Sequence, residues 1–339
     1  MKENKKDSNS QNEKYLTAIE FISKIQLPLN ISRTNTITNM LNDNVITYDD
    51  IPIEILENYK LNIGKNTSPV ENAIMKFKDL KIQYDITKNI ENNVNDFMVK
   101  YTDCFANINP PIFYIENKIN YFFFRMRQLS DIVDFNNIDE YSYPKNSCVL
   151  GRANLPQKPV FYASISPITA INEMKKHNKA TEFVISKWKI KNPDKSIRIV
   201  PTYTKDTEHI FNEIIEIAKP TSTEQQKKYL EFVGEQLLSE NYSNSALLAY
   251  NIIYKNKMDI ITYPSVIDDK GINVAISPQL IDNESIVLDK VYIVEIKPDK
   301  KIILRKIGVF IDNKFDWVLI KDLQSNSPYL QEFHNIFNI

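Results

Sequence analysis

Glycine is scarce in this chain of 339 residues, which has only five glycines, at positions 64, 151, 234, 271 and 308. No two of them have the spacing of G-x-G-x-x-G or of G-x-x-x-x-G-K-[ST]. The G-x-S-x-G elbow of the α/β-hydrolases is also absent. The sequence therefore rules out a standard dinucleotide-binding fingerprint, a P-loop and a nucleophile elbow.

Cysteine and histidine are rare as well, with two and three residues. Two cysteines cannot form a disulfide framework, which favours a reducing compartment. We expect Cys104 and Cys148 to be buried or incidental thiols. The histidines are scattered and C-x-x-C is absent, so we expect no metal site. Residues 1–13 are polar, unlike a signal peptide, and no run of about 18 apolar residues predicts a membrane span. We expect a cytoplasmic protein that does not bind membranes.

The charges balance, because 42 Lys and Arg face 43 Asp and Glu. A net charge of -1 argues against the basic surface of a nucleic-acid-binding protein. The chain has 38 Asn and 36 Lys but only six Arg. Most Asn and Lys residues are therefore uninformative, whereas each Arg and Gly is a more useful signal.

Two regions with different residue patterns follow the polar tail of residues 1–13. Residues 14–110 are expected to be mostly helical, with one helix near 15–25 and another that begins at the capping box of residues 68–71 (Ser-Pro-Val-Glu). Residues 111–325 mix strands with helices, which indicates an α+β domain. Residues 326–339 are expected to be a C-terminal tail.

Within the second region, aromatic and β-branched runs alternate with helical patterns. Helices are expected at about 166–177, 209–219, 224–239 and 245–256. Strands are expected at about 112–115, 119–126, 159–164, 181–190, 196–200, 259–266, 273–276, 287–296, 302–311 and 315–320.

Three short stretches combine rare or chemically active residues. The first is residues 151–156 (Gly-Arg-Ala-Asn-Leu-Pro), just before the strand at 159–164. The second is residues 169–173 (Thr-Ala-Ile-Asn-Glu), on the helix after that strand. The third is residues 263–266 (Tyr-Pro-Ser-Val), with Gly271 and Asn273 just behind it.

These stretches, with the strand between the first two, contain the groups that a nicotinamide dinucleotide needs. The planar guanidinium of Arg152 matches a phosphate bidentately. Tyr162 offers a flat ring, and the carboxylate of Glu173 can stabilise an oxocarbenium-like sugar. Each residue also has an ordinary explanation, since a loop Arg is often a surface ion pair, a strand Tyr is often core and a helical Glu is often solvated.

In order and spacing, the stretches resemble the RES family, which is named for an Arg, a Glu and a Ser. The matching residues are Arg152, Tyr162, Glu173 and Ser265. Arg125 resembles the arginine that often opens the domain. The resemblance covers roughly residues 120–320 and implies a fold like that of the ADP-ribosyltransferases, with mixed β-sheets and intervening helices. Studied members are toxins that consume NAD⁺ or ADP-ribosylate a protein, usually neutralised by a partner antitoxin.

Some positions depart from the family pattern. Many short members carry Trp where this chain has Ala153, which changes the packing expected near the dinucleotide. Transferases that modify arginine often place Glu or Gln where this chain has Ile171, so water, phosphate or another nucleophile is the favoured acceptor. The helical region before residue 111 has no counterpart in the small toxin core.

The resemblance implies a bacterial toxin that is an NAD⁺ glycohydrolase or phosphorylase, with NAD⁺ as substrate and no further cofactor or metal. It implies that Arg152 binds phosphate together with Asn154, and that Arg125 is a second candidate for this role. An antitoxin protein is the implied partner.

The resemblance also implies roles for the remaining residues of the pattern. Tyr162 would stack on nicotinamide, Glu173 would stabilise the ribosyl cation, and Ser265 would hydrogen-bond within the pocket or fix its floor. Two alternatives stay open: a protein-modifying ADP-ribosyltransferase, and a non-catalytic binding protein that acts through its N-terminal helices.

Two neighbouring features have ordinary explanations that we prefer. His177, four residues after Glu173, is expected to be a solvent-facing residue at the helix end. Residues 268–269 (Asp-Asp) are expected to form a turn rather than a metal pair.

Overall fold

The structure is a computed structural model, and the chain divides into two compact units, Met1–Lys81 with Met98–Asn109, and Ile82–Phe97 with Pro110–Ile339. It describes residues 69–80, 85, 87–105, 113–115, 122–145, 148–176, 180–191, 197–207, 224–240, 242–311 and 314–337. The tail of residues 1–13, the helix expected near 15–25 and the helix expected at 209–219 lie outside these ranges.

The first unit contains helix α4 (Pro69–Asp79) and the last part of helix α5 (Ile90–Phe105). The start of α4 agrees with the capping box in the sequence. Its Phe77 is buried and contacts Tyr101 and Phe105 of α5, with ring centroids 6.4 and 5.5 Å apart. Part of the apolar face of α4 is therefore covered by α5.

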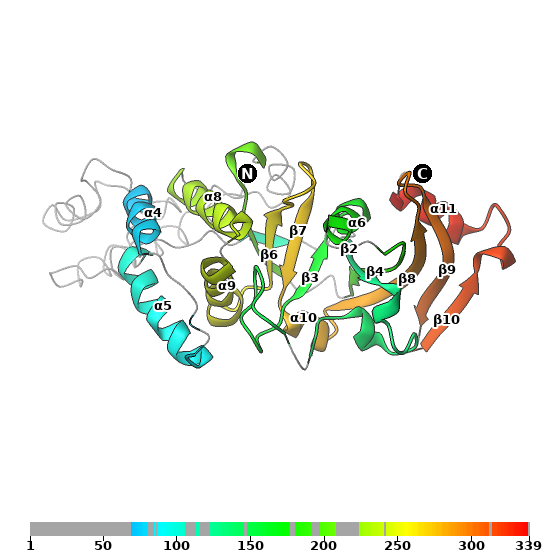
Figure 1. The fold of residues 1–339 in the computed structure, drawn as a ribbon, viewed down its shortest axis with the longest axis horizontal. Helices are drawn as coiled ribbons and strands as arrows, with labels where there is room; N and C mark the ends of the chain where they lie inside the picture. The colour runs from blue at the N-terminus through cyan, green and yellow to red at the C-terminus, as the bar shows by residue number, and fades with distance from the viewer. Residues whose placement is uncertain are drawn as a thin grey trace, which may run out of the picture. The chain divides into compact units, whose positions relative to one another are not determined.

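The second unit is built on one ten-stranded sheet of described strands (Figure 1). Its strands are β1 (Phe113–Ile115), β2 (Phe122–Gln128), β3 (Phe161–Ser164), β4 (Glu182–Ile190), β5 (Ile197–Pro201), β6 (Ile260–Pro264), β7 (Ile272–Ile276), β8 (Ile286–Ile296), β9 (Ile302–Ile311) and β10 (Lys314–Leu319). The strand order is β1-β5-β6-β7-β3-β2-β4-β8-β9-β10. Each expected strand overlaps one of these.

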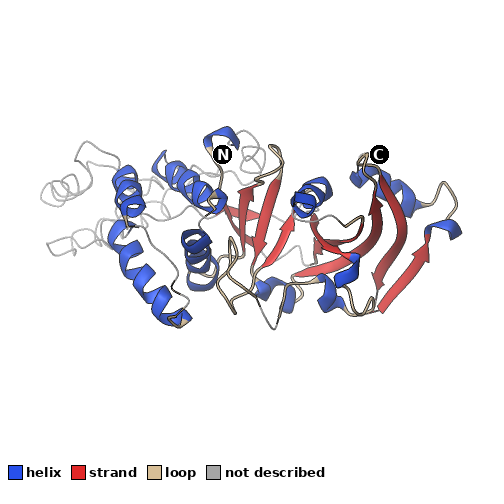
Figure 2. Cartoon of the chain, in the orientation of Figure 1, coloured by secondary structure: helices blue, strands red, loops and turns tan. Residues whose placement is uncertain are grey.

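Neighbouring strands in the sheet are antiparallel except β5 and β6, which run parallel. Within this unit, helices lie beside the strands in Figure 2. The α+β class expected from the sequence is confirmed. Strands β3 and β7 pair in the middle of the order, next to β2 on one side and β6 on the other.

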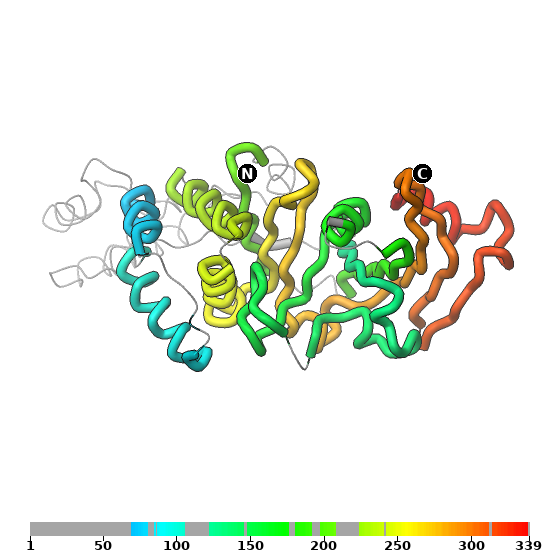
Figure 3. The backbone as a smooth tube through the Cα atoms, viewed as in Figure 1, coloured from blue at the N-terminus to red at the C-terminus, as the bar shows by residue number. Residues whose placement is uncertain are grey.

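Five α-helices accompany the sheet in the described part of this unit: α6 (Pro167–Lys176), α8 (Glu224–Leu238), α9 (Tyr242–Tyr250), α10 (Pro278–Asp282) and α11 (Pro328–Phe337). Figure 3 traces the chain from β3 directly into α6. Helix α9 continues as a π-helical turn over Asn251–Lys255. None of the described helices has the length and the apolar composition of a membrane-spanning segment.

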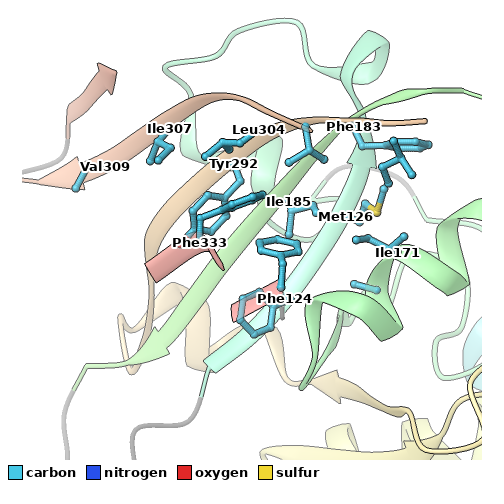
Figure 4. Packing of buried hydrophobic residues seen from close by; sticks show 14 residues of the cluster. Phe124, Met126, Ile171, Phe183, Ile185, Tyr292, Leu304, Ile307, Val309 and Phe333 are labelled. Carbon is cyan, nitrogen blue, oxygen red and sulfur yellow. The ribbon is translucent and has the colours of Figure 1, made fainter. Parts of the chain in front are cut away.

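A large apolar cluster joins α6 and α11 to strands β2, β4, β8 and β9 (Figure 4). Helix α6 contributes Ala170 and Ile171, which belong to the same cluster as Phe124 and Met126 of β2. Because burying one large apolar side chain contributes about 1.5–3 kcal/mol, this cluster fixes α6 firmly on the sheet. The packing matters for function because α6 also carries Glu173.

The residues expected to be a tail at 326–339 include helix α11. Its Phe333 and Phe337 are buried in the same apolar cluster. Its Glu332 forms ion pairs with Lys187 of β4 and Lys290 of β8, two lysines that lie opposite each other in the paired strands. Apolar burial and partly buried charge thus both attach α11 to the sheet.

Candidate active site

Helix α6 presents Glu173 to the middle of the sheet. Ala170 and Ile171 of this helix are buried in the apolar cluster, whereas Glu173 is half-buried. A carboxylate in this position keeps some access to solvent while its helix is held rigidly. This arrangement differs from the fully solvated helical Glu of the ordinary explanation.

The Glu173 carboxylate is held by two side chains from distant parts of the chain. Its Oε1 atom accepts a hydrogen bond of 2.6 Å from the Ser265 hydroxyl and one of 2.7 Å from the Asn273 side-chain amide. The other oxygen, Oε2, has no hydrogen-bond partner among the described residues. One oxygen of the carboxylate is therefore fixed by the protein, and the other is held by no hydrogen bond from the described residues.

Asn273 belongs to a row of side chains that crosses the sheet. It lies opposite Tyr263 of β6 and opposite Ser164 of β3, which in turn lies opposite Phe124 of β2. Directly opposed residues of antiparallel strands point to the same face. Phe124 packs in the cluster that includes α6, so the whole row lies on the face that α6 covers.

Ser265 is fixed by the loop that joins β6 to β7. Its hydroxyl oxygen accepts hydrogen bonds from the backbone N–H groups of Ile267 and Asp268, at 3.1 and 3.0 Å. The Asp268 carboxylate in turn accepts a 2.7 Å bond from the hydroxyl of Thr169 on α6. The loop is thus tied to the same helix that carries Glu173.

Gly271 allows this loop to approach α6 closely. A Cβ atom at this position would lie 2.6 Å from the Thr169 methyl group and 2.8 Å from the Asp268 Cβ. Both distances are far shorter than van der Waals contact, so a larger residue would push the loop off the helix. Residues 268–269 lie in this turn, as expected, and Asp268 stabilises it.

A second group of contacts surrounds Tyr162. Its hydroxyl accepts a 2.7 Å bond from the Ala153 backbone N–H and donates a 2.9 Å bond to the Asn154 side-chain oxygen. Asn154 is buried, and its amide nitrogen donates to the carbonyls of Val149 and Leu155. Asn154 therefore braces Tyr162 and the turn, and both of its amide hydrogens are used inside the protein.

Gly151 is required by the same turn. A Cβ atom there would overlap the side-chain oxygen of Asn154 and lie 3.1 Å from the Tyr162 hydroxyl. Gly151 and Gly271, two of the five glycines in the chain, thus stand at positions where the candidate site leaves no room for a side chain.

Arg152 holds the end of helix α8. Its Nη1 donates to the carbonyls of Leu237 and Ser239, and its guanidinium lies 5.1 Å from the ring centroid of Tyr242. The carbonyl end of a helix carries partial negative charge, which favours a cation there. The Nε and Nη2 atoms of Arg152 have no hydrogen-bond partner in the described part of the chain, so one edge of the guanidinium stays open.

Tyr263 interacts with residues of both groups of contacts, those around Glu173 and those around Tyr162. Burial is the main reason why its pKa is raised well above the ordinary value, followed by its electrostatic interactions with Tyr162 and Glu173, while Arg152 acts in the opposite direction. The pKa of Tyr162 is also raised, again chiefly by burial. Both phenols are therefore neutral at physiological pH. Together with the contacts above, these interactions show that Arg152, Tyr162, Glu173 and Ser265 lie in one region of the structure.

Arg125 occupies a different position. Phe124 and Met126 face the α6 cluster, so Arg125, which lies between them on β2, starts on the opposite face of the strand. Its Nη1 donates to the Tyr162 backbone carbonyl at 3.1 Å and its guanidinium lies 5.8 Å from the Phe161 ring centroid, while its buried Nε has no hydrogen-bond partner among the described residues. Burial, and then the charge of Arg127, lowers its pKa to about 10.

The remaining residues that the sequence singles out have different outcomes. His177 lies outside the described residues. Cys104 and Cys148 are half-buried and form no disulfide. The Cys148 thiol donates to the Leu155 carbonyl at 3.4 Å, in the turn that braces Tyr162. Among the residues that the structure describes, no group of three or more His, Cys, Asp and Glu side chains is placed to hold a metal ion.

No sequence motif marks Ser164 as a site residue, and Asn273 has no role assigned to it, although it lies in the motif around Gly271. The two side chains meet only through the pairing of β3 with β7, 109 positions apart. A chain with 38 asparagines offers no compositional signal for one of them. The period-two alternation of the strands is the one signal that could place both on the face of α6.

Comparison with known proteins identifies a family over the middle of the chain. Residues 124–291 match the model of the RES domain, and this span contains Arg152, Tyr162, Glu173 and Ser265. One chain of the crystal structure of the M. tuberculosis MbcT-MbcA toxin-antitoxin complex is similar over 54% of this chain and 87% of that chain, with 10% identity and a TM-score of 0.36. No curated protein matches. Over residues 124–291, this chain belongs to the RES domain family.

Proposed function

We propose that this RES domain cleaves the bond between nicotinamide and ribose in NAD⁺ and that the protein acts as a bacterial toxin. The observation that carries the proposal is the state of Glu173, a half-buried carboxylate whose Oε1 is held by Ser265 and Asn273 and whose Oε2 has no hydrogen-bond partner among the described residues. A preorganised negative charge of this kind contributes most where positive charge develops during a reaction.

In the proposed reaction, the bond between the ribose C1′ and the nicotinamide nitrogen breaks, and the electron pair leaves with nicotinamide. The ring nitrogen loses its positive charge, while the ribose becomes an oxocarbenium-like cation. Oε2 of Glu173 stabilises this cation. A water oxygen then bonds to C1′ and releases a proton to solvent, which yields ADP-ribose; inorganic phosphate in place of water would yield ADP-ribose phosphate.

The surrounding residues would bind and orient the dinucleotide. The open edge of Arg152, formed by Nε and Nη2, would bind the pyrophosphate bidentately while Nη1 stays anchored at α8. Tyr162, with its hydroxyl fixed by Ala153 and Asn154, would stack on nicotinamide. We assign the phosphate to Arg152 before Arg125, because Arg125 starts on the face of β2 away from α6.

The acceptor and the partner belong to the proposal as well. Ile171 is buried in the apolar cluster, so it offers no second polar group beside Glu173, and we favour water or phosphate over a protein arginine. A toxin in the bacterial cytoplasm would need a neutralising partner, and we propose an antitoxin protein that covers or blocks this site. NAD⁺ would be the substrate, with no further cofactor.

The test is to incubate the purified chain with NAD⁺ labelled in its adenine ring and to follow nicotinamide release with and without phosphate. Free ADP-ribose would identify a glycohydrolase, and a phosphorylated product that requires phosphate would identify a phosphorylase. Label retained on protein would support the ADP-ribosyltransferase alternative. No nicotinamide release under any condition would contradict the proposal and favour a binding protein.

A further inference from the structure

The orientation of the Asn273 side chain decides whether Glu173 faces a hydrogen-bond donor or an acceptor. An asparagine amide has a donating end and an accepting end of nearly the same shape. In the structure the Nδ2 end donates to Glu173 Oε1 at 2.7 Å. The reversed amide would bring its oxygen against the carboxylate, and the two groups would repel each other.

Ser164 completes and holds the first orientation. Its hydroxyl donates a 2.6 Å hydrogen bond to Asn273 Oδ1. An ionised carboxylate can only accept hydrogen bonds, so the Nδ2 end faces Glu173, and the Ser164 hydroxyl satisfies the Oδ1 end by donating its one hydrogen. The hydrogen bonds therefore run in one direction, from Ser164 through Asn273 to Glu173. We call Ser164 and Asn273 the relay.

Both relay residues are well buried, because Ser164 is 3% exposed and Asn273 is 7% exposed. Water therefore competes little for their hydrogen bonds, and the loss of one partner leaves the other unsatisfied inside the protein. They lie directly opposite each other on β3 and β7. The relay thus ties the carboxylate to the sheet, whereas Ser265 ties it to the β6–β7 loop.

We propose that Ser164 and Asn273 are positioning residues, which together fix Oε1 of Glu173 so that Oε2 faces the substrate. This inference rests on the proposed function, since it assigns a purpose to the orientation of Glu173. The two holds on Oε1 act from different elements, so removal of the relay would leave Ser265 in place and allow the carboxylate to rotate about that one hydrogen bond.

The first experiment measures the nicotinamide-release kinetics of Ser164→Ala and Asn273→Ala. Misplacement of a reacting group by about 1 Å can cost on the order of 10²-fold in rate, so we expect kcat to fall by about 10- to 100-fold. KM for NAD⁺ should change far less, because neither residue is assigned to contact the substrate. Ser164→Thr, which keeps the hydroxyl, should restore part of the lost rate. Parent kcat in both alanine variants would overturn the inference.

Thr262→Val is the matched control. Thr262 is buried on β6, next to Tyr263, and its side chain lies on the opposite face of the sheet from the relay. Its hydroxyl has no hydrogen-bond partner among the described residues, so its removal should leave kcat unchanged. Equal losses of kcat in Thr262→Val and Ser164→Ala would contradict a positioning role and indicate a general effect on the sheet.

A second experiment does not depend on turnover. The thermal unfolding midpoints of Ser164→Ala, Glu173→Gln and the double variant form a double-mutant cycle. No hydrogen bond joins Ser164 directly to Glu173 in the described structure, so coupling must pass through Asn273 and should disappear when the cycle is repeated in Asn273→Ala. Additive shifts in the first cycle would overturn the relay even if NAD⁺ is cleaved. Coupling without nicotinamide release would keep the relay and overturn the proposed function.

Discussion

The hydroxyl of Ser265 and the carboxylate of Glu173 are joined by a 2.6 Å hydrogen bond, although 92 positions separate the two residues in the chain. The same hydroxyl oxygen accepts two backbone hydrogen bonds from its own loop. The conformation of that loop is therefore transmitted directly to the carboxylate. This hydrogen bond explains how Tyr-Pro-Ser, which by itself would indicate only a turn, contributes to the candidate site.

Arg152→Lys should weaken substrate binding more than it slows the reaction. Lysine can donate to the α8 carbonyls but lacks the flat second edge that matches a phosphate. A hydrogen bond to a charged group contributes about 1.5–3 kcal/mol, so we expect KM for NAD⁺ to rise about tenfold or more. The measurement is steady-state nicotinamide release over a range of NAD⁺ concentrations.

Arg305→Lys is the control for that variant, since the half-exposed Arg305 of β9 forms an ion pair with Glu295 of β8. It should behave like the parent protein. An unchanged KM in Arg152→Lys would remove the phosphate assignment from Arg152 and transfer it to Arg125.

Gly151→Ala should impair both stability and activity. The new Cβ would overlap the Asn154 oxygen and would break its hydrogen bond with Tyr162. Overpacking of this kind costs about 1–3 kcal/mol in the free energy of unfolding, and the displaced Tyr162 should reduce nicotinamide release. Chemical denaturation and the release assay together check this expectation.

Gly308→Ala separates the two effects. Its Cβ would lie 2.8 Å from the Trp317 ring, between β9 and β10 and on strands that carry none of the site residues. We expect a loss of stability with normal activity after correction for the folded fraction. If Gly151→Ala retained full activity per folded molecule, the tight turn would have no role in the site.

Phe333→Ala should destabilise the domain strongly. Phe333 is 2% exposed in the cluster that also holds α6. Truncation of a buried phenylalanine typically costs about 3–5 kcal/mol, whereas Asn335→Ala, at an exposed position of the same helix, should stay within about 0.5 kcal/mol of the parent. Similar unfolding free energies for the two variants would show that α11 is dispensable.

Glu332 should make the stability of the domain depend on acid pH. Partial burial raises its pKa, but hydrogen bonds from Lys187 and Lys290 outweigh this effect, so the folded-state pKa lies below the ordinary value of 4.5. A lowered carboxyl pKa stabilises the fold above the ordinary value, and this contribution is lost as pH falls through the folded-state pKa. Glu332→Gln should therefore flatten the decline of unfolding free energy below about pH 4.5 and cost about 1 kcal/mol near pH 7, because solvent partly screens these ion pairs.

The control for this experiment is Glu284→Gln. Glu284 pairs with Lys191 at an exposed site, where ion pairs contribute little to stability. Its curve of unfolding free energy against pH should follow the parent closely. Part of the acid decline should also remain in Glu332→Gln, because Asp289 pairs with the same Lys187. A Glu332→Gln curve parallel to the parent would contradict the assigned role of the ion pairs.

Much of the fold could be predicted from local sequence patterns, because the strands are long enough to show their composition and the helices carry their start signals. Helix α6, for example, begins at Pro167 and ends near its expected limit. Helix α11 is not predicted, although Ser327 and Pro328 mark its start and Phe333 and Phe337 have helical spacing. The helix is short, so its apolar pattern is weak in the sequence, and its stability depends on packing against the sheet.

Site residues of rare types could be predicted from the sequence, whereas site residues of common types could not. Arg152, with Gly151 beside it, stands out in a chain with six arginines and five glycines. The relay of Ser164 and Asn273 depends on strand register, which no local pattern specifies. The anchoring of Arg152 at α8 likewise depends on where that helix ends in space.

The most direct test of the central claim is the rate of nicotinamide release by Glu173→Gln. Glutamine keeps the shape of the side chain and can still accept hydrogen bonds from Ser265 and Asn273, but it removes the negative charge. We expect kcat to fall on the order of 10²-fold or more, with binding of NAD⁺ largely kept. A Glu173→Gln protein with a normal unfolding midpoint and the parent rate of nicotinamide release would contradict the account.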